Sequence, residues 1–104
     1  MERYSAKRID EMRRMVLPIE LRRRLKLDSG KSVFLQRINS MVVMQTLEEQ
    51  YTEENLNPRD DCIILKVDEL GRLQFPVKLI KDMGWEIESK VIMYYVDDET
   101  VVLR

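Results

Sequence analysis

The chain has 104 residues, of which 44% are hydrophobic and 36% are charged, a composition typical of a soluble globular protein with one modest core. No apolar run approaches the ~20 residues of a membrane-spanning helix, and the first residues lack the apolar stretch of a secretory signal. The sequence contains no histidine, one cysteine and no glycine-rich phosphate loop. These absences argue against an enzyme, a metal site and a cofactor, and together they favour a cytoplasmic protein.

The net charge of −1 hides an uneven distribution along the chain. Residues 1–47 hold eleven Lys or Arg and five Asp or Glu, a net charge of +6. Residues 48–61 carry a net charge of −5, and residues 62–104 carry −2. Attraction of an anionic ligand depends on where charge lies as well as on its total. The first 47 residues are therefore expected to form an anion-binding surface.

The first 47 residues predict four strands and one short helix. The strands are expected at residues 4–9, 14–17, 32–38 and 41–46. A turn is expected at 10–13, and Pro18 suits the first position of a helix. Leu21 and Leu25 are four residues apart, so they share the buried face of that helix. The order of elements is ββαββ.

An acidic segment follows at residues 48–61, with few apolar residues and one proline, and it is interpreted as a solvated linker. The remaining residues, 62–104, predict the same ββαββ order again. Their strands are expected at residues 62–67, 72–75, 90–96 and 100–104.

An internal repeat relates the two parts of the chain. A displacement of 58 residues places Asp10, Glu11, Arg14, Pro18 and Leu21 on Asp68, Glu69, Arg72, Pro76 and Leu79. Identities at fixed spacing make chance similarity between two β-rich stretches a poor explanation. Each unit has about 45 residues, which is too few for a core of its own without a disulfide or metal. The units are therefore expected to bury their apolar faces on each other or on another chain.

Residues 7–25 resemble the N-terminal domain of bacterial DNA-binding transcription regulators of the AbrB/SpoVT type. Residues 66–72, with Pro76 and Leu79, resemble it too. The resemblance implies a mainly β fold with short helices, in which two ββαββ repeats interleave as one swapped-hairpin β-barrel. MraZ proteins carry two such units in one chain, which implies that this chain builds one barrel with a pseudo-twofold axis. The competing arrangement pairs the first repeats of two chains.

In this family, basic residues on the strands and around the short helix contact DNA. Carried over by position, the expected DNA-binding residues are Lys7, Arg8, Arg14, Arg22 and Arg23 in the first repeat and Lys66, Arg72 and Lys81 in the second. With Leu21 and Leu25 turned inward, Arg23 is expected to point outward and Arg22 to flank the buried face.

The second repeat departs from this pattern. Leu65 takes the position of Lys7, and Ile80 takes that of Arg22, which predicts weaker DNA contact by this repeat. The first repeat departs from it as well, because Arg13 stands where the second repeat has Gly71. A turn glycine suits a positive φ that an arginine adopts at a cost of about 1 kcal/mol. Arg13 is expected either to distort the loop or to add a contact.

Several residues also have structural interpretations. Arg14 and Arg72 are expected to form ion pairs with the acidic residues of their turns, which leaves donors for phosphate. Arg24 is expected to stabilise the helix end and to pair with Glu20. The residues expected to fill the core are Cys62, Trp85, Met12, Met15, Met41, Met44, Met83 and Met93.

The sequence thus predicts a non-enzymatic regulator that binds double-stranded DNA with a sequence preference, without a cofactor or membrane partner. Phosphate contacts by the first-repeat arginines are expected to supply most of the affinity, and one or two of them to read bases. Two alternatives remain open. One is a protein-interaction module of the same fold that does not bind DNA, and the other is an antitoxin of the MazE kind. The oligomeric state is open too, and a homo-oligomer of complete barrels is compatible with this prediction.

Overall fold

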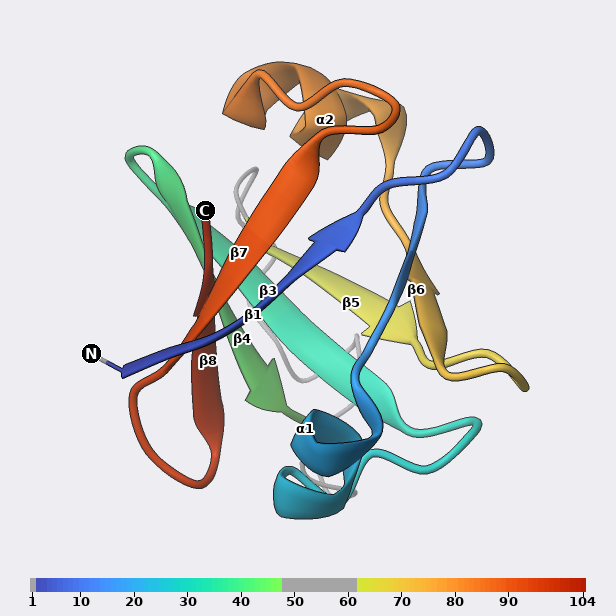
Figure 1. The fold of residues 1–104 in the computed structure, drawn as a ribbon, viewed down its shortest axis with the longest axis vertical. Helices are drawn as coiled ribbons and strands as arrows, with labels where there is room; N and C mark the ends of the chain where they lie inside the picture. Colours follow the sequence, from blue (N-terminus) through green and yellow to red (C-terminus); the bar gives the residue numbers. More distant parts are fainter. Residues whose placement is uncertain (1, 48–61) are drawn as a thin grey trace.

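The computed structural model describes residues 2–47 and 62–104, and its elements follow the order strand–strand–helix–strand–strand twice (Figure 1). The first half contains β1 (Glu2–Arg8), β2 (Arg14–Val16), α1 (Ile19–Arg24), β3 (Ser32–Ile38) and β4 (Met41–Thr46). The second half contains β5 (Cys62–Lys66), β6 (Arg72–Gln74), α2 (Val77–Met83), β7 (Lys90–Tyr95) and β8 (Thr100–Leu103). The linker predicted at 48–61 lies outside the described residues, so the division of the chain at its two ends stays a prediction.

Prolines mark where both helices begin. Pro18 and Pro76 have φ values of −57° and −62° and directly precede α1 and α2, one position earlier than expected. The proline ring fixes φ near this value. Proline also has no N–H group, and this costs no hydrogen bond at the start of a helix, because an N–H group there has no carbonyl acceptor within the helix. At the other end of α2, Gly84 adopts φ 67°, the left-handed conformation that commonly ends a helix.

Strands of the two halves interleave in one antiparallel sheet of order β1-β7-β8-β4-β3-β5. The first strand of each half lies beside the third strand of the other, because β1 pairs with β7 and β5 pairs with β3. The fourth strands pair with each other, β4 with β8, and the second strands form a separate ladder, β2 with β6.

A pseudo-twofold axis follows from this order, because exchanging the two halves reproduces it in reverse. The axis passes through symmetric pairs in two ladders, Met15 with Leu73 and Val43 with Val102. The helices α1 and α2 lie at opposite ends of the curved sheet (Figure 1). The predicted fold class is confirmed: a mainly β protein with two short helices, in which two ββαββ repeats form a swapped-hairpin, barrel-like fold.

The hydrophobic core is shared by the halves. Fully buried side chains include Met15, Leu17, Leu21 and Leu35 from the first half and Leu73, Phe75, Met93 and Leu103 from the second. Trp85 packs against Phe75 with ring centroids 5.4 Å apart, which agrees with its expected packing role. Both halves contribute fully buried side chains to one cluster, so each completes the core of the other.

Of the residues expected in the core, Met15, Met44 and Met93 are fully buried, Met41, Cys62, Met83 and Trp85 are half-buried, and Met12 is exposed. Met12 is 53% exposed, because it lies in the turn between β1 and β2, where no strand or helix covers it. Cys62 is only half-buried, because β5 is an edge strand with one neighbour in the described sheet.

Because the halves share one core, a cavity made in the first half should destabilise the second. Leu17→Ala is expected to lower the free energy of unfolding by roughly 2–5 kcal/mol. Urea unfolding should show the same lowered midpoint by Trp85 fluorescence, which reports the second half, and by far-UV circular dichroism. Leu70→Ala is the control, since Leu70 is 66% exposed and its loss should change little. A Trp85 transition unaffected by Leu17→Ala would show that the halves unfold independently.

Candidate nucleic-acid interface

The turn between β1 and β2 is built around the carboxylate of Asp10. Its Oδ1 accepts hydrogen bonds from the backbone N–H groups of Met12 (2.9 Å) and Arg14 (2.8 Å). Its Oδ2 accepts one from the Nε of Arg14 at 2.9 Å. Asp68 repeats the arrangement in the second half, where the Nε of Arg72 donates to Oδ2 at 2.7 Å. Both turn aspartates thus fix the backbone of the turn and the direction of one arginine side chain.

These contacts shift the acidity of both aspartates. Desolvation by burial, the largest single influence, raises the pKa of Asp10. Four favourable influences together outweigh this desolvation: the backbone hydrogen bonds from Arg14 and Met12, and the hydrogen bond and the charge of the Arg14 guanidinium. The pKa of Asp10 is therefore lowered. The pKa of Asp68 is lowered in the same way, with desolvation opposed chiefly by its hydrogen bonds with Arg72.

The β2–β6 ladder places these two arginines on one face. Met15 and Leu73 are fully buried, so the alternate residues of both strands point outward. In the register, Arg14 lies opposite Gln74, and Arg72 lies opposite Val16. Arg14 and Arg72 therefore flank the pseudo-twofold axis on the outer face of the ladder, which we call the ladder face. Their Nε atoms bond the turn carboxylates, which leaves the terminal nitrogens as donors for a ligand.

Arg22 of α1 packs against the turn that leads into the β2–β6 ladder. A Cβ added to Gly71 would lie only 2.5 Å from the Cζ of Arg22, so the guanidinium rests directly on the turn of the other half. The Nε of Arg22 is buried and has no hydrogen-bond partner among the described residues. The guanidinium thus lies at the start of β6, one residue before Arg72 in the chain. Arg22 is half-buried there, which agrees with its predicted place flanking the buried face of α1.

Arg23 and Lys81 occupy equivalent positions on the two helices. Both side chains are exposed, Arg23 on α1 and Lys81 on α2. The helices lie at opposite ends of the curved sheet (Figure 1), so these two cations belong to elements at opposite ends of the molecule.

The three predicted residues on β1 and β5 do not all join the ladder face. Lys7 and Arg8 are consecutive in a strand, so their side chains point to opposite faces of the sheet. Arg8 is exposed and forms an ion pair with Glu88 at 3.4 Å. Lys66 is equivalent to Arg8 and is exposed on β5. A single ligand on one face of the sheet would therefore meet Lys7 or the pair Arg8 and Lys66, but not all three.

Arg24 has the structural role expected of it, although with other partners. Its guanidinium lies 4.1 Å from the ring centroid of Tyr95, and its Nε donates a hydrogen bond to Asp98 at 2.9 Å. The hydrogen bond to Asp98 is the main reason that the pKa of Arg24 is raised. The contacts tie α1 to the β7–β8 hairpin of the other half, which the predicted pair with Glu20 would not do.

Arg13 makes a contact that the sequence did not specify. Its Nε donates a hydrogen bond to the carbonyl oxygen of Phe75 at 3.1 Å, and its φ is 63°. The signal in the sequence was the replacement of a turn glycine. That replacement marked Arg13 as unusual but could not identify its hydrogen-bond acceptor, because Phe75 lies 62 residues away in the sequence.

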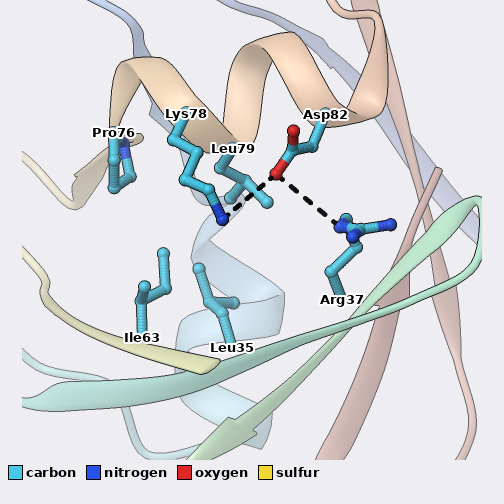
Figure 2. A pocket seen from close by; sticks show the side chains of 7 residues that line it. All are labelled: Leu35, Arg37, Ile63, Pro76, Lys78, Leu79 and Asp82. Atoms are coloured by element: carbon cyan, nitrogen blue, oxygen red, sulfur yellow. Dashed lines mark ion pairs between the residues drawn. The ribbon is translucent and has the colours of Figure 1, made fainter. Parts of the chain in front are cut away.

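A cavity of about 140 Å³ lies between α2 and strands β3 and β5 (Figure 2). Its lining residues are Leu35, Arg37, Ile63, Pro76, Lys78, Leu79 and Asp82. The carboxylate of Asp82 lies 3.7 Å from the Nζ of Lys78 and 3.9 Å from the Nε of Arg37. The volume is well below the roughly 300–1,000 Å³ of small-molecule sites. The cavity reflects looser packing of α2, whose Leu79 is only partly buried, whereas Leu21 of α1 is completely buried.

Within residues 2–47 and 62–104, no group of three or more potential ligands is arranged to hold a metal ion. In the same ranges, no helix has the length and apolar character needed to cross a membrane.

Comparison with known proteins supports an AbrB-like fold. No family model matches the chain. A stretch of 42 residues is 43% identical to the transition state regulatory protein AbrB of Bacillus subtilis (strain 168), and it covers 40% of this chain and 43% of AbrB. The chain thus matches less than half the length of that relative. The solution structure of PHS018 from Pyrococcus horikoshii is similar in fold, with a TM-score of 0.55 and 15% identity over 98% of this chain and 86% of that one.

The lowered pKa values of the turn aspartates predict a pH-dependent contribution to stability. An aspartate whose pKa is lowered on folding stabilises the protein above its unfolded pKa, about 3.9, and the contribution disappears as pH falls through the lower folded value. Asp68→Asn should therefore reduce the free energy of unfolding at pH 7, and the difference from the unaltered protein should shrink as the solution is acidified below about pH 4.

Urea unfolding at a series of pH values measures this difference. Asp28→Asn is the matched control, because Asp28 is exposed and lies outside both turns. A difference between the unaltered protein and Asp68→Asn that stays constant at every pH would contradict the ionic role of the turn carboxylate.

Proposed function

We propose that this chain is a transcription regulator of the AbrB/SpoVT type that binds duplex DNA through the ladder face. The observation that carries the proposal is that Arg14 and Arg72 flank the pseudo-twofold axis on this face, while Arg22 packs on the turn just before Arg72. The partial identity to AbrB, whose name describes a regulatory protein, points to the same function. No step of this function needs an enzyme activity or a cofactor, and a cytoplasmic location accords with a DNA partner.

The chemistry of the face suits a polyanion. Each guanidinium presents N–H donors in a planar fork that matches two phosphate oxygens or the O6 and N7 atoms of guanine. The turn aspartates orient Arg14 and Arg72 before any ligand arrives, so little side-chain entropy is lost on binding. Phosphate contacts would supply most of the affinity, and one or two of these arginines would read bases in the major groove.

The pseudo-twofold axis suggests the form of the target. Proteins with a twofold axis read duplex sites whose two halves are related by the same symmetry. One chain offers both halves of such a surface, and assembly of complete barrels, as a homo-oligomer, would add further half-sites. The MraZ-like arrangement of one barrel per chain belongs to this proposal.

A second candidate is a protein-interaction module of the same fold, including an antitoxin that binds a toxin. Exposed apolar side chains recur at equivalent positions of the halves, Met12 with Leu70 and Ile19 with Val77. Exposed apolar groups that gather on one surface are typical of protein interfaces. These four side chains flank the turns and helix starts, so they would border the ladder face.

Duplex binding that weakens with salt is the first test. If about five phosphates are neutralised, the logarithm of the binding constant should fall with the logarithm of salt concentration with a slope of about −4 to −5. Fluorescence anisotropy with labelled promoter duplexes from the source genome measures this slope. Absence of binding at low salt, or a slope near zero, would refute the DNA-binding proposal and favour the interaction module.

The helix positions provide the second test. Arg23→Ala should weaken duplex binding by roughly 1–3 kcal/mol if Arg23 contacts a base, while stability is unchanged because the side chain is exposed. Arg22→Ala should weaken it in the same range, although its half-buried position requires a parallel unfolding measurement. Lys81→Ala should matter less, because its neighbour Ile80 provides no charge. Equal losses from Arg23→Ala and Lys81→Ala would show that both helices contribute alike.

A further inference from the structure

The two halves differ at two positions that meet across the barrel, one in the turn and one in the helix. Arg13 and Gly71 are equivalent turn residues, and Arg22 and Ile80 are equivalent helix residues. Each turn is bonded to the other half at the residue that precedes the helix proline. The N–H of Leu17 donates to the Gly71 carbonyl oxygen at 2.8 Å, and the N–H of Phe75 donates to that of Arg13 at 2.8 Å. The barrel therefore contains two equivalent turn–helix contacts.

In the first contact, the turn residue is Gly71 and the helix residue is Arg22. A Cβ on Gly71 would lie 2.5 Å from Cζ, 2.7 Å from Nη1 and 2.8 Å from Nε of Arg22. The guanidinium therefore occupies the space in which a side chain of the turn residue would begin. Any larger residue at this position would displace the Arg22 guanidinium, and the φ of 74° also lies in the left-handed region that favours glycine.

In the second contact, the turn residue is Arg13 and the helix residue is Ile80. A long side chain from the helix would occupy the space that the Arg13 side chain needs, as the first contact illustrates. Ile80 is short and packs partly buried against the core, so this space is left to Arg13. The chain thus has one arginine at each contact, supplied by the helix in the first contact and by the turn in the second, and both arginines belong to the first half.

Arg13 is fixed in position by the second half. Its Nε donates to the carbonyl oxygen of Phe75 at 3.1 Å, while its own carbonyl accepts from the N–H of Phe75. The side-chain amide of Gln74 donates to the carbonyl oxygen of Met12 at 2.9 Å, which ties the same turn to β6. Arg13 keeps a φ of 63°, which a non-glycine residue retains where the surrounding contacts stabilise it. With Nε bonded to the backbone, its terminal nitrogens are left to contact an anion.

We infer that Arg13 binds DNA phosphate at the turn–helix contact beside α2, in place of the arginine that α2 lacks at Ile80. The inference rests on the proposed function. It means that a guanidinium lies at the turn–helix contact on each side of the pseudo-twofold axis, Arg22 beside α1 and Arg13 beside α2, and that the first half supplies both.

Arg13→Gly is the direct test, because it gives the first turn the residue that the second already has. Duplex binding should weaken about tenfold, and the slope of log affinity against log salt should become shallower by about 0.9, the contribution of one phosphate contact. The double variant Arg13→Gly with Ile80→Arg recreates the pairing of Gly71 with Arg22. It should restore both the affinity and the slope.

Lys26→Gly is the matched control. Lys26 is exposed, has φ 57° and is equivalent to Gly84, so its replacement removes one positive charge and one positive-φ side chain without touching either turn contact. It should leave the salt slope nearly unchanged. Thermal unfolding of all variants should show that each is folded.

Each outcome supports or overturns the inference. If the unaltered protein binds and Arg13→Gly behaves like Lys26→Gly, the inference is wrong while the DNA-binding proposal stands. If Arg13→Gly weakens binding without changing the salt slope, and Ile80→Arg does not restore it, Arg13 only supports the turn and the inference is also wrong. If the unaltered protein does not bind duplex DNA at low salt, the proposed function and the inference fail together.

Discussion

The constraint on which the structure depends is that neither half of the chain can bury its apolar residues alone. A unit of this size exposes too much of its surface to be stable without a partner. The halves satisfy this constraint by exchanging strands, so that β1 completes the sheet beside β7 and β5 completes it beside β3. The symmetric pair Met15 and Leu73 then closes the core at the axis. The pseudo-twofold symmetry of the surface is a consequence of this shared core.

The shared core also determines where the basic residues lie. Each turn crosses to the other half, so the arginines that follow the turns, Arg14 and Arg72, meet on one ladder. Each turn aspartate uses its two carboxylate oxygens for different partners: Oδ1 accepts the backbone N–H groups of the turn, and Oδ2 accepts the Nε of the arginine that follows. An ion pair and a ligand contact are therefore compatible roles for one arginine.

The halves have diverged within limits that packing imposes. Where the helix carries Arg22, the turn has no side chain, and where the turn carries Arg13, the helix carries the shorter Ile80. The helices themselves differ in packing. Leu21 of α1 is completely buried, and Arg24 ties this helix to Tyr95 and Asp98. Leu79 of α2 is partly buried beside a cavity, and Asp82 at the position of Arg24 faces Lys78 and Arg37 instead (Figure 2).

The sequence by itself determined the element order, the repeat, the turns and the beginning of each helix. These features depend on residues a few positions apart: the alternation of a strand, a proline before a helix, an aspartate that bonds the next N–H groups. The small size of the repeat indicated that the units must share a core with each other or with another chain, and the resemblance to the AbrB/SpoVT family implied the fold class. The tertiary structure decided which side chains meet. Arg22 on Gly71, Arg13 on Phe75 and Arg24 on Tyr95 all join residues from different halves. Local patterns contain no information about such contacts, because they arise only when the two halves interleave.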